Sequence, residues 1–173
     1  MLSSHELNTM IELHQLQGRS FVVGLSGGVD SVACLLLLHQ WCRENSGELK
    51  AVHVHHGLSD NADAWASFVT HLCHKLQVPL SIRHVTLRSK ARTSLEQLAR
   101  EERYRVLAEE MPPNSVLVTG HHRGDQAETF LLRLMRGAGL TGLSAMRPLR
   151  SFPNELGRQK ALTLLRPLLA CDK

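Results

Sequence analysis

The chain has 173 residues, the length of one ordinary α/β domain. Hydrophobic residues make up 43% of it but aromatic residues only 4%, so the core has to be aliphatic, as in parallel sheets packed by helices. The net charge of +4 is compatible with nucleic acid binding without demonstrating it, and no apolar stretch has the length of a membrane-spanning helix.

Hydrophobic patterning in the first half of the chain predicts helices and strands in alternation. Ser3 and Glu6 have the spacing of a capping box, which predicts a short helix over about residues 4–16. After it we expect a buried strand over 21–25, a buried helix from 32 to the turn at 45–47, a strand over 49–55, a helix over 62–76 and a strand over 78–87. The apolar side of the helix over 62–76 carries Trp65, Phe68, Val69, Leu72 and Leu76.

The second half continues the alternation. Thr93 and Glu96 again have capping-box spacing and open a helix to about residue 110. A strand over 115–119, a helix over about 125–135 with Ala127, Phe130, Leu131 and Leu134 on its apolar face, and a fifth strand over 161–166 follow. This order predicts an α/β fold, a doubly wound parallel five-stranded sheet with helices on both faces. If the fourth strand flanks the first, their carboxyl ends meet at one crevice.

The stretch Ser26-Gly27-Gly28-Val29-Asp30-Ser31 joins the first strand to a helix. Its glycines allow a sharp turn, and the free N–H groups of the helix's first turn face a ligand with the positive end of the helix dipole behind them, which is the geometry of a phosphate site. The loop is neither a Walker A motif, because no Lys follows the glycines, nor a Rossmann fingerprint. Asp30 fits a Mg²⁺ ion that bridges carboxylate and phosphate oxygens, or equally a first-turn acid that offsets the dipole.

Three histidines, His53, His55 and His56, cluster at the end of the second strand. His53 and His55 could share a face and bind zinc, but the sequence places no third ligand. Because ligands of open α/β sheets bind beyond the carboxyl ends of strands, we favour nucleotide contact or strand-end packing.

The stretch from His121 to Thr129 is the second chemically dense region. Asp125 and Glu128 lie three residues apart in the first turn of a helix, which by itself favours a capping box. If the pair faces the phosphate loop, a site for Mg²⁺ or an amine becomes the better interpretation. On the preceding helix, Arg100 and Arg103 share a face and are either solvated or placed to contact phosphate or RNA.

The loop resembles the pyrophosphate loop, Ser-Gly-Gly-x-Asp-Ser, of the ATP pyrophosphatases, which cleave ATP between its α- and β-phosphates to adenylate a substrate. Together with residues 53–58 and 120–146, it resembles the tRNA(Ile)-lysidine synthetase family. Shorter matches at residues 98–104 and 165–169 extend the resemblance over nearly the whole chain.

The resemblance implies a Rossmann-like, adenine nucleotide alpha hydrolase-like fold. It implies a ligase that uses ATP and Mg²⁺ to adenylate the wobble cytidine in the CAU anticodon of tRNA(Ile), which the ε-amine of free L-lysine then attacks, giving lysidine, AMP and pyrophosphate. The implied ATP-binding residues are Ser26, Gly27, Gly28, Val29, Asp30 and Ser31. The implied catalytic and Mg²⁺-binding acids are Asp30, Asp125 and Glu128. Candidates for substrate or phosphate contact are His55, His56, Arg100, Arg103, His121 and His122.

The chain departs from this family in two respects. Gly124 stands where family members often have an additional Asp, which puts any role of that carboxylate in doubt. Family members also continue well beyond this length with domains that bind tRNA. We therefore expect residues 1–173 to be a catalytic domain without those tRNA-binding domains. The sequence is compatible with a homodimer.

The four cysteines bear on the cellular compartment of the protein and on the alternative function of tRNA thiolation. None of Cys34, Cys42, Cys73 and Cys171 forms a Cys-x-x-Cys pair and no signal peptide precedes them, which predicts reduced structural cysteines in a cytoplasmic protein. A tRNA-thiolating enzyme, the alternative within the superfamily, would usually carry paired cysteines. A non-catalytic adenine nucleotide binder would leave Asp30, Asp125 and Glu128 without a purpose.

Overall fold

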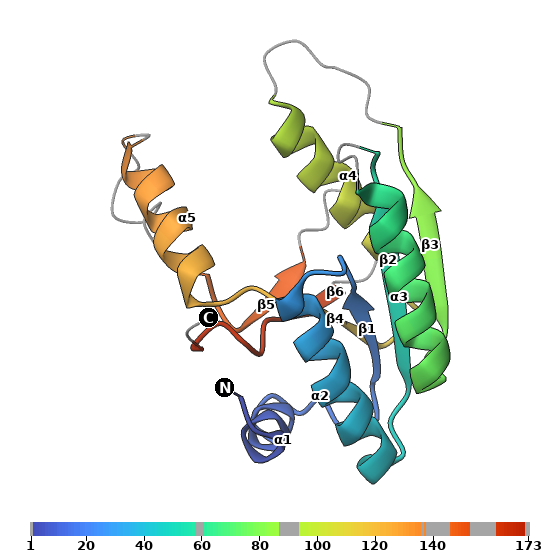
Figure 1. The fold of residues 1–173 in the computed structure, drawn as a ribbon. Helices are drawn as coiled ribbons and strands as arrows, with labels where there is room; N and C mark the ends of the chain where they lie inside the picture. Colours follow the sequence, from blue (N-terminus) through green and yellow to red (C-terminus); the bar gives the residue numbers. More distant parts are fainter. Residues whose placement is uncertain are drawn as a thin grey trace.

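A computed structural model of the chain describes residues 2–57, 61–86, 94–135, 137, 146–152 and 162–171, and in it helices alternate with strands (Figure 1). In chain order the elements are α1 (Ser4–Leu13), β1 (Ser20–Gly24), α2 (Val29–Asn45), β2 (Leu49–His55), α3 (Ala62–Leu76), β3 (Leu80–His84), α4 (Leu95–Glu109), β4 (Ser115–Val118), α5 (Arg123–Met135), β5 (Leu149–Phe152) and β6 (Leu162–Leu165). Within these ranges no helix is both long and apolar enough to cross a membrane.

The strands form one six-stranded sheet in the order β3-β2-β1-β4-β6-β5. Five of them are parallel, which confirms the predicted doubly wound sheet, and β1 lies between β2 and β4, which confirms the switch point. The sixth strand, β5, is an addition to the predicted five. It pairs antiparallel with β6, and an antiparallel neighbour needs no crossover helix, so the alternation of strands and helices could not reveal it.

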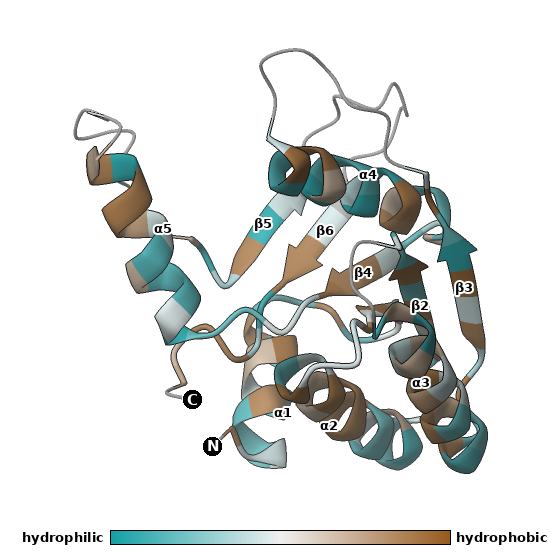
Figure 2. Cartoon of the chain, turned by 45° about the horizontal axis from the view of Figure 1, so that its top comes forward, coloured by the Kyte–Doolittle hydropathy of each residue, from teal (hydrophilic) through white to brown (hydrophobic). Residues whose placement is uncertain are grey.

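Two aliphatic cores lie on opposite faces of the sheet, because successive residues of a strand point to opposite sides. Phe21 and Val23 of β1 pack with α1, α2 and α3, whereas Val22 packs with Leu107 of α4. Figure 2 shows α1, α2 and α3 gathered on one side of the sheet and α4 on the other. The predicted cover on both faces is therefore confirmed.

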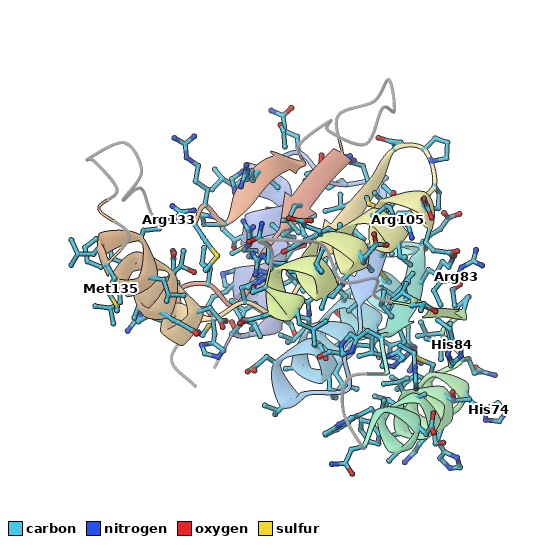
Figure 3. The ribbon with its side chains drawn as sticks, turned by 90° about the horizontal axis from the view of Figure 1, so that it is seen from above. His74, Arg83, His84, Arg105, Arg133 and Met135 are labelled. Atoms are coloured by element: carbon cyan, nitrogen blue, oxygen red, sulfur yellow. The ribbon has the colours of Figure 1, made fainter. Side chains whose placement is uncertain are left out.

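Helix α5 stands apart from these cores. None of its described residues is buried, and Phe130, Leu131 and Leu134 of the expected apolar face are 45%, 55% and 52% exposed. Figure 3, which looks down on the molecule from above, shows α5 beside the body with Met135 at its far end. The helix is present as predicted, and its apolar face lies exposed in the described part of the chain. On α3, Trp65 and Phe68 are likewise half exposed, at 44% and 45%.

Side-chain caps fix two helix starts. At α1, the Ser3 hydroxyl accepts from the Glu6 N–H and the Glu6 carboxylate accepts from the Ser3 N–H, which is the predicted capping box. At α4, the cap is Ser94, whose hydroxyl accepts from the Gln97 N–H. The predicted pair that begins with Thr93 is thus wrong by one residue, and Thr93 lies outside the described residues.

Glu110 joins β2, β3 and the end of α4. Its carboxylate accepts from Lys50 Nζ at 2.6 Å and pairs with Arg83, and its side chain is only 8% exposed. The hydrogen bond from Lys50 holds the pKa of Glu110 at about 2, against the effect of burial, which would raise it.

We expect Glu110→Gln to destabilise the fold at neutral pH. Because the folded pKa lies below the unfolded value of 4.5, the stabilisation is present above pH 4.5 and is lost as the pH falls toward about 2. The shift corresponds to roughly 3 kcal/mol, which exposure of the partners reduces to about 2 kcal/mol. Urea unfolding of both proteins at pH 7 and near pH 3 measures this difference. Equal stability at pH 7 would rule out the contribution, and the half-exposed Glu109 supplies the control Glu109→Gln.

Candidate active site at the switch point of the sheet

A cleft of about 440 Å³ lies at the carboxyl ends of β1, β2 and β4, where open α/β sheets bind ligands. Its walls come from the loop after β1, the end of β2, one side of α4, the end of β4 and the start of α5. The predicted site residues that line it are Ser26, Gly28, Asp30, Ser31, His55, His56, Arg100, Arg103, His121, His122, Asp125 and Glu128. Two loop residues do not line it: Gly27 is buried next to Trp65, and Val29 is 67% exposed.

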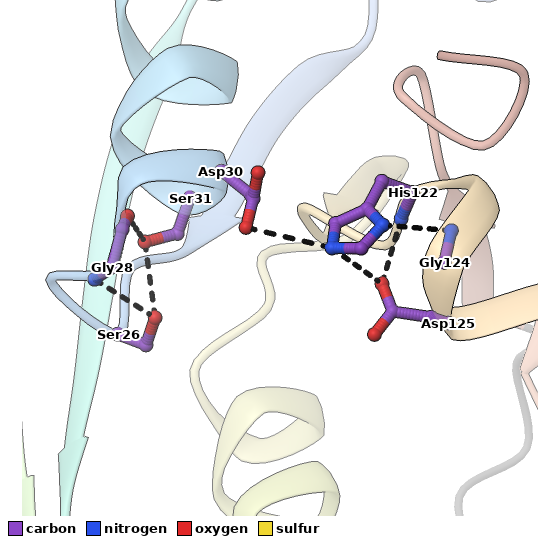
Figure 4. Close-up of polar contacts among 7 residues, drawn as sticks. All are labelled: Ser26, Gly28, Asp30, Ser31, His122, Gly124 and Asp125. Atoms are coloured by element: carbon purple, nitrogen blue, oxygen red, sulfur yellow. Dashed lines mark hydrogen bonds and ion pairs between the residues drawn. The ribbon is translucent and has the colours of Figure 1, made fainter. Parts of the chain in front are cut away.

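The loop after β1 is held by its own hydroxyl groups (Figure 4). The Ser31 hydroxyl donates to the Gly28 carbonyl at 2.8 Å and lies 3.1 Å from the Ser26 hydroxyl, which in turn accepts from the Gly28 N–H at 3.3 Å. Gly28 begins α2 without a side-chain cap, so no side chain at this position competes for the first N–H groups of the helix. An uncapped helix start of this kind suits an anion such as phosphate.

Two glycines set the position of this loop. Gly27 has a φ of +94°, and a Cβ there would lie 2.7 Å from Cε3 of Trp65. Gly120, at the end of β4, would place a Cβ 2.7 Å from the Asp30 carbonyl carbon. The end of β4 therefore lies directly against the first turn of α2, which is the meeting of β1 and β4 that the sequence predicts.

We expect Gly27→Val to abolish ATP binding, because the variant is strained at this φ and its side chain collides with Trp65. Gly18→Val is the matched control, since Gly18 has a φ of +71° with no atom within 4 Å of its Cβ position. Both variants should lose about 1–2 kcal/mol of stability from backbone strain, but only Gly27→Val should lose ATP affinity in calorimetry. Retained affinity in Gly27→Val would show that the phosphate site lies elsewhere.

The three histidines at the end of β2 do not converge on a metal. Nδ1 of buried His53 donates to the Leu25 carbonyl at 2.8 Å, and Nε2 of His55 donates to Asp63 Oδ1 at 2.9 Å. Within the described residues, no group of three or more His, Cys, Asp or Glu side chains could hold a metal ion. The zinc alternative is therefore not supported, and strand-end packing describes His53.

The acids of the loop and of α5 face each other across His122 (Figure 4). Nε2 of His122 lies 3.9 Å from Asp30 Oδ2 and 3.7 Å from Asp125 Oδ2. Glu128, one turn further along α5, lines the same cleft. Mg²⁺ is commonly held by one or two carboxylates with phosphate oxygens and water as the other ligands, and this arrangement of carboxylates beside a phosphate loop fits that mode.

Hydrogen bonds at the start of α5 distinguish the roles of Asp125 and Glu128. The Asp125 carboxylate accepts from the His122 backbone N–H at 2.8 Å, and Nδ1 of His122 accepts from the Gly124 N–H at 2.9 Å. The capping pair is therefore His122 with Asp125, and the sequence interpretation that paired Asp125 with Glu128 is wrong. Glu128 has no hydrogen bond or ion pair among the described residues, so capping does not explain it.

The wall opposite α5 is basic. Arg100 and Arg103 of α4 line it, with the Arg100 guanidinium 5.4 Å from the centre of the Tyr104 ring. Burial, with Arg166 and Arg100 nearby, lowers the pKa of His121 to about 4, so His121 is neutral at pH 7. Burial also lowers the pKa of Arg103, for which the described residues supply no carboxylate partner. A guanidinium without a carboxylate partner suits a phosphate or carboxylate group.

Sequence reasoning missed several residues of the site. Trp65 from α3 and Tyr104 from α4 line the cleft, and Arg166 lies buried beside the basic wall with its Nη1 donating to the Arg147 carbonyl at 2.9 Å. Nε of Arg166 is buried without a hydrogen bond among the described residues. Arg166 is the last residue of the strand predicted over 161–166, and that position at the carboxyl edge of the sheet was the available signal.

Comparison with protein families shows that the profile of the PP-loop domain matches residues 3–173. The chain belongs to the PP-loop domain family. The matched residues include the loop over 26–31, on which the predicted resemblance to the ATP pyrophosphatases rests.

Curated relatives of this PP-loop chain include three proteins named tRNA(Ile)-lysidine synthase. The protein of Actinobacillus pleuropneumoniae serotype 3 is 47% identical over 90% of the chain, that of Escherichia coli O157:H7 46% over 90%, and that of Vibrio cholerae 41% over 96%. The resemblance predicted from the sequence is confirmed. The chain spans only 34% to 36% of the length of these relatives.

Solved structures support the fold of the PP-loop domain. The U34-tRNA thiolase NcsA from Methanococcus maripaludis superposes with a TM-score of 0.73 over 98% of this chain and 59% of that one, at 19% identity. The FMN adenylyltransferase of Candida glabrata gives a TM-score of 0.54 over 96% and 50%, at 17% identity. At these identities the similarity shows the fold alone.

Proposed function

We propose that this PP-loop domain is the ATP-using catalytic domain of an enzyme that joins L-lysine to the wobble cytidine in the CAU anticodon of tRNA(Ile). The observation that carries the proposal is a cleft in which an uncapped phosphate loop that includes Asp30 faces Asp125 and Glu128. Identity of 41% to 47% with proteins named tRNA(Ile)-lysidine synthase supports the choice of substrate.

In the first step, the N–H groups at the start of α2 and the hydroxyls of Ser26 and Ser31 hold the β- and γ-phosphates of ATP. Cytosine has one carbonyl oxygen, which attacks the α-phosphorus, and pyrophosphate leaves. Asp30 and Asp125 would supply oxygen ligands to Mg²⁺, which, when bound, would offset the charge that develops on the leaving group. Val52, Val54 and Trp65 also line the cleft and offer adenine an apolar surface.

In the second step, the acids of α5 receive the lysine side chain. Asp125 or Glu128 binds the ε-ammonium and takes one proton from it, because an amine attacks only when it is neutral. The amine then attacks the ring carbon activated by adenylation, and the carbon–oxygen bond to AMP breaks. Arg100, Arg103, His56 and His121 are placed to bind a phosphate of the RNA or the carboxylate of the amino acid.

The thiolating alternative has less support in this cleft. Cys34, Cys42 and Cys73 are buried and Cys171 is half-buried, and none of these four cysteines, all of which belong to the described part of the chain, lines the cleft. Burial raises the pKa of Cys34 to about 12, which suits a packing residue and not a sulfur carrier.

The test is release of pyrophosphate from ATP by the protein, with tRNA(Ile) carrying a CAU anticodon and with or without lysine. We expect AMP and lysidine to form in equal amounts only when tRNA and lysine are both present. A thiolating enzyme would release pyrophosphate without lysine, and a nucleotide-binding protein would release none.

Residues 1–173 alone should bind ATP but modify tRNA poorly, since a net charge of +4 neutralises few phosphates.

A further inference from the structure

His122 is the cap of α5. Its backbone carbonyl accepts from the Gln126 N–H at 3.3 Å, the first hydrogen bond of the helix. Its ring nitrogen Nδ1 accepts from the Gly124 N–H at 2.9 Å, and its own N–H donates to Asp125 at 2.8 Å. Two backbone hydrogen bonds thus fix the residue at the start of the helix, and the hydrogen bond to Nδ1 orients the ring.

The other ring nitrogen faces the cleft. Because Nδ1 accepts a hydrogen bond, the hydrogen of the neutral ring is on Nε2. Nε2 lies 3.9 Å from Asp30 Oδ2 and 3.7 Å from Asp125 Oδ2, so this one N–H lies between the loop acid and the α5 acid (Figure 4). Both distances exceed that of a hydrogen bond, and the N–H remains able to donate to either acid or to a ligand between them.

Gly124 provides the space for the ring. A Cβ at this position would lie 2.6 Å from Cε1 and 2.9 Å from Nδ1 of His122. Its φ is not among the positive values, so the position needs glycine for space and not for backbone conformation. Any side chain at residue 124 would push the imidazole out of its place between the acids.

We propose that His122 is a positioning residue, which holds Asp125 opposite Asp30 and directs one N–H into the gap between them, and that Gly124 is what makes room for it. This role rests on the proposed function, in which Asp30 and Asp125 act together on one ligand. It assigns to His122 a role beyond capping, and capping alone is the competing explanation.

Two substitutions separate these explanations, because each keeps one nitrogen's function. In His122→Asn the side-chain oxygen can take the place of Nδ1 and preserve the cap, while nothing reaches the position of Nε2. In His122→Gln the amide N–H reaches toward the position of Nε2, while the cap is lost. Gly124→Ala, a third variant, displaces the ring but leaves a good helix former at the second helical position.

The measurements are the melting temperature, the Mg²⁺ concentration for half-maximal ATP binding, and pyrophosphate release. We expect His122→Asn and Gly124→Ala to melt near wild type, to need on the order of tenfold more Mg²⁺ and to release pyrophosphate on the order of tenfold more slowly. His122→Gln should melt lower but stay closer to wild type in its Mg²⁺ requirement.

If His122→Asn keeps both the wild-type Mg²⁺ requirement and the wild-type rate, His122 is only a cap and the proposal is overturned. ATP binding is measured without tRNA or lysine. A Mg²⁺ effect in that assay therefore supports the role of His122 even if lysine proves not to be the second substrate, so failure of the proposed function is distinguishable from failure of this inference.

Discussion

Asp30→Ala should abolish pyrophosphate release and leave the fold nearly intact. Asp30 lies in the first turn of α2 beside the phosphate loop, and its side chain is 30% exposed to the cleft. Loss of a first-turn acid costs about 0.3–1 kcal/mol, a shift of roughly 1–4 °C in melting temperature for a chain of this size. Loss of a group that neutralises charge on the leaving pyrophosphate removes several kcal/mol from the transition state, so activity should fall on the order of 1,000-fold.

Glu6→Ala is the matched control for Asp30→Ala. Glu6 is also a first-turn acid, but it belongs to the capping box of α1 and does not line the cleft. Its loss should cost about 1 kcal/mol of stability with unchanged activity. The two variants should therefore lose comparable stability, but only Asp30→Ala should lose activity. Near-normal pyrophosphate release by folded Asp30→Ala would remove Asp30 from the mechanism.

The sequence could predict the placement of the site because that placement depends on strand order. Residues 26–31 and 121–128 each follow a buried strand, and the carboxyl ends of parallel strands share one edge of the sheet. Once β4 pairs with β1, as Val22 with Leu117 does, the loop and the start of α5 have to meet. Alternation of strands and helices predicted the parallel sheet but left that pairing as a condition, which the structure meets.

Other features depend on contacts that no local pattern records. The sequence places Trp65 on a helix's apolar side, yet Trp65 lies against Gly27 of the phosphate loop and lines the cleft. The partner of Asp125 is His122, a residue that is uncommon as a helix cap, so a search for capping boxes pointed to Glu128 instead. Arg166 needed the position of β6 beside β4 before it could be placed near His121.

The cap geometry sharpens the prediction for the two acids of α5. Asp125 accepts a capping hydrogen bond, so Asp125→Ala should lose about 1 kcal/mol of stability along with activity, and that variant alone cannot distinguish the two roles. Asp125→Asn can, since an amide oxygen still accepts from the His122 N–H while the charge is gone. We expect it to melt near wild type and to be nearly inactive.

Glu128→Ala is the decisive variant, because within the described residues Glu128 caps nothing and pairs with nothing. Alanine is at least as good a helix former as glutamate, so the melting temperature should not fall, while lysidine formation should fall on the order of 100-fold or more if the carboxylate binds Mg²⁺ or the lysine ammonium. Glu101→Ala, at another exposed helix acid, which bonds only Gln97, should change neither. Partial rescue by excess Mg²⁺ would assign Glu128 to the metal, and partial rescue by excess lysine would assign it to the amine. Unchanged specific activity in Glu128→Ala and in Asp125→Asn would show that the start of α5 is a helix cap and not a catalytic wall.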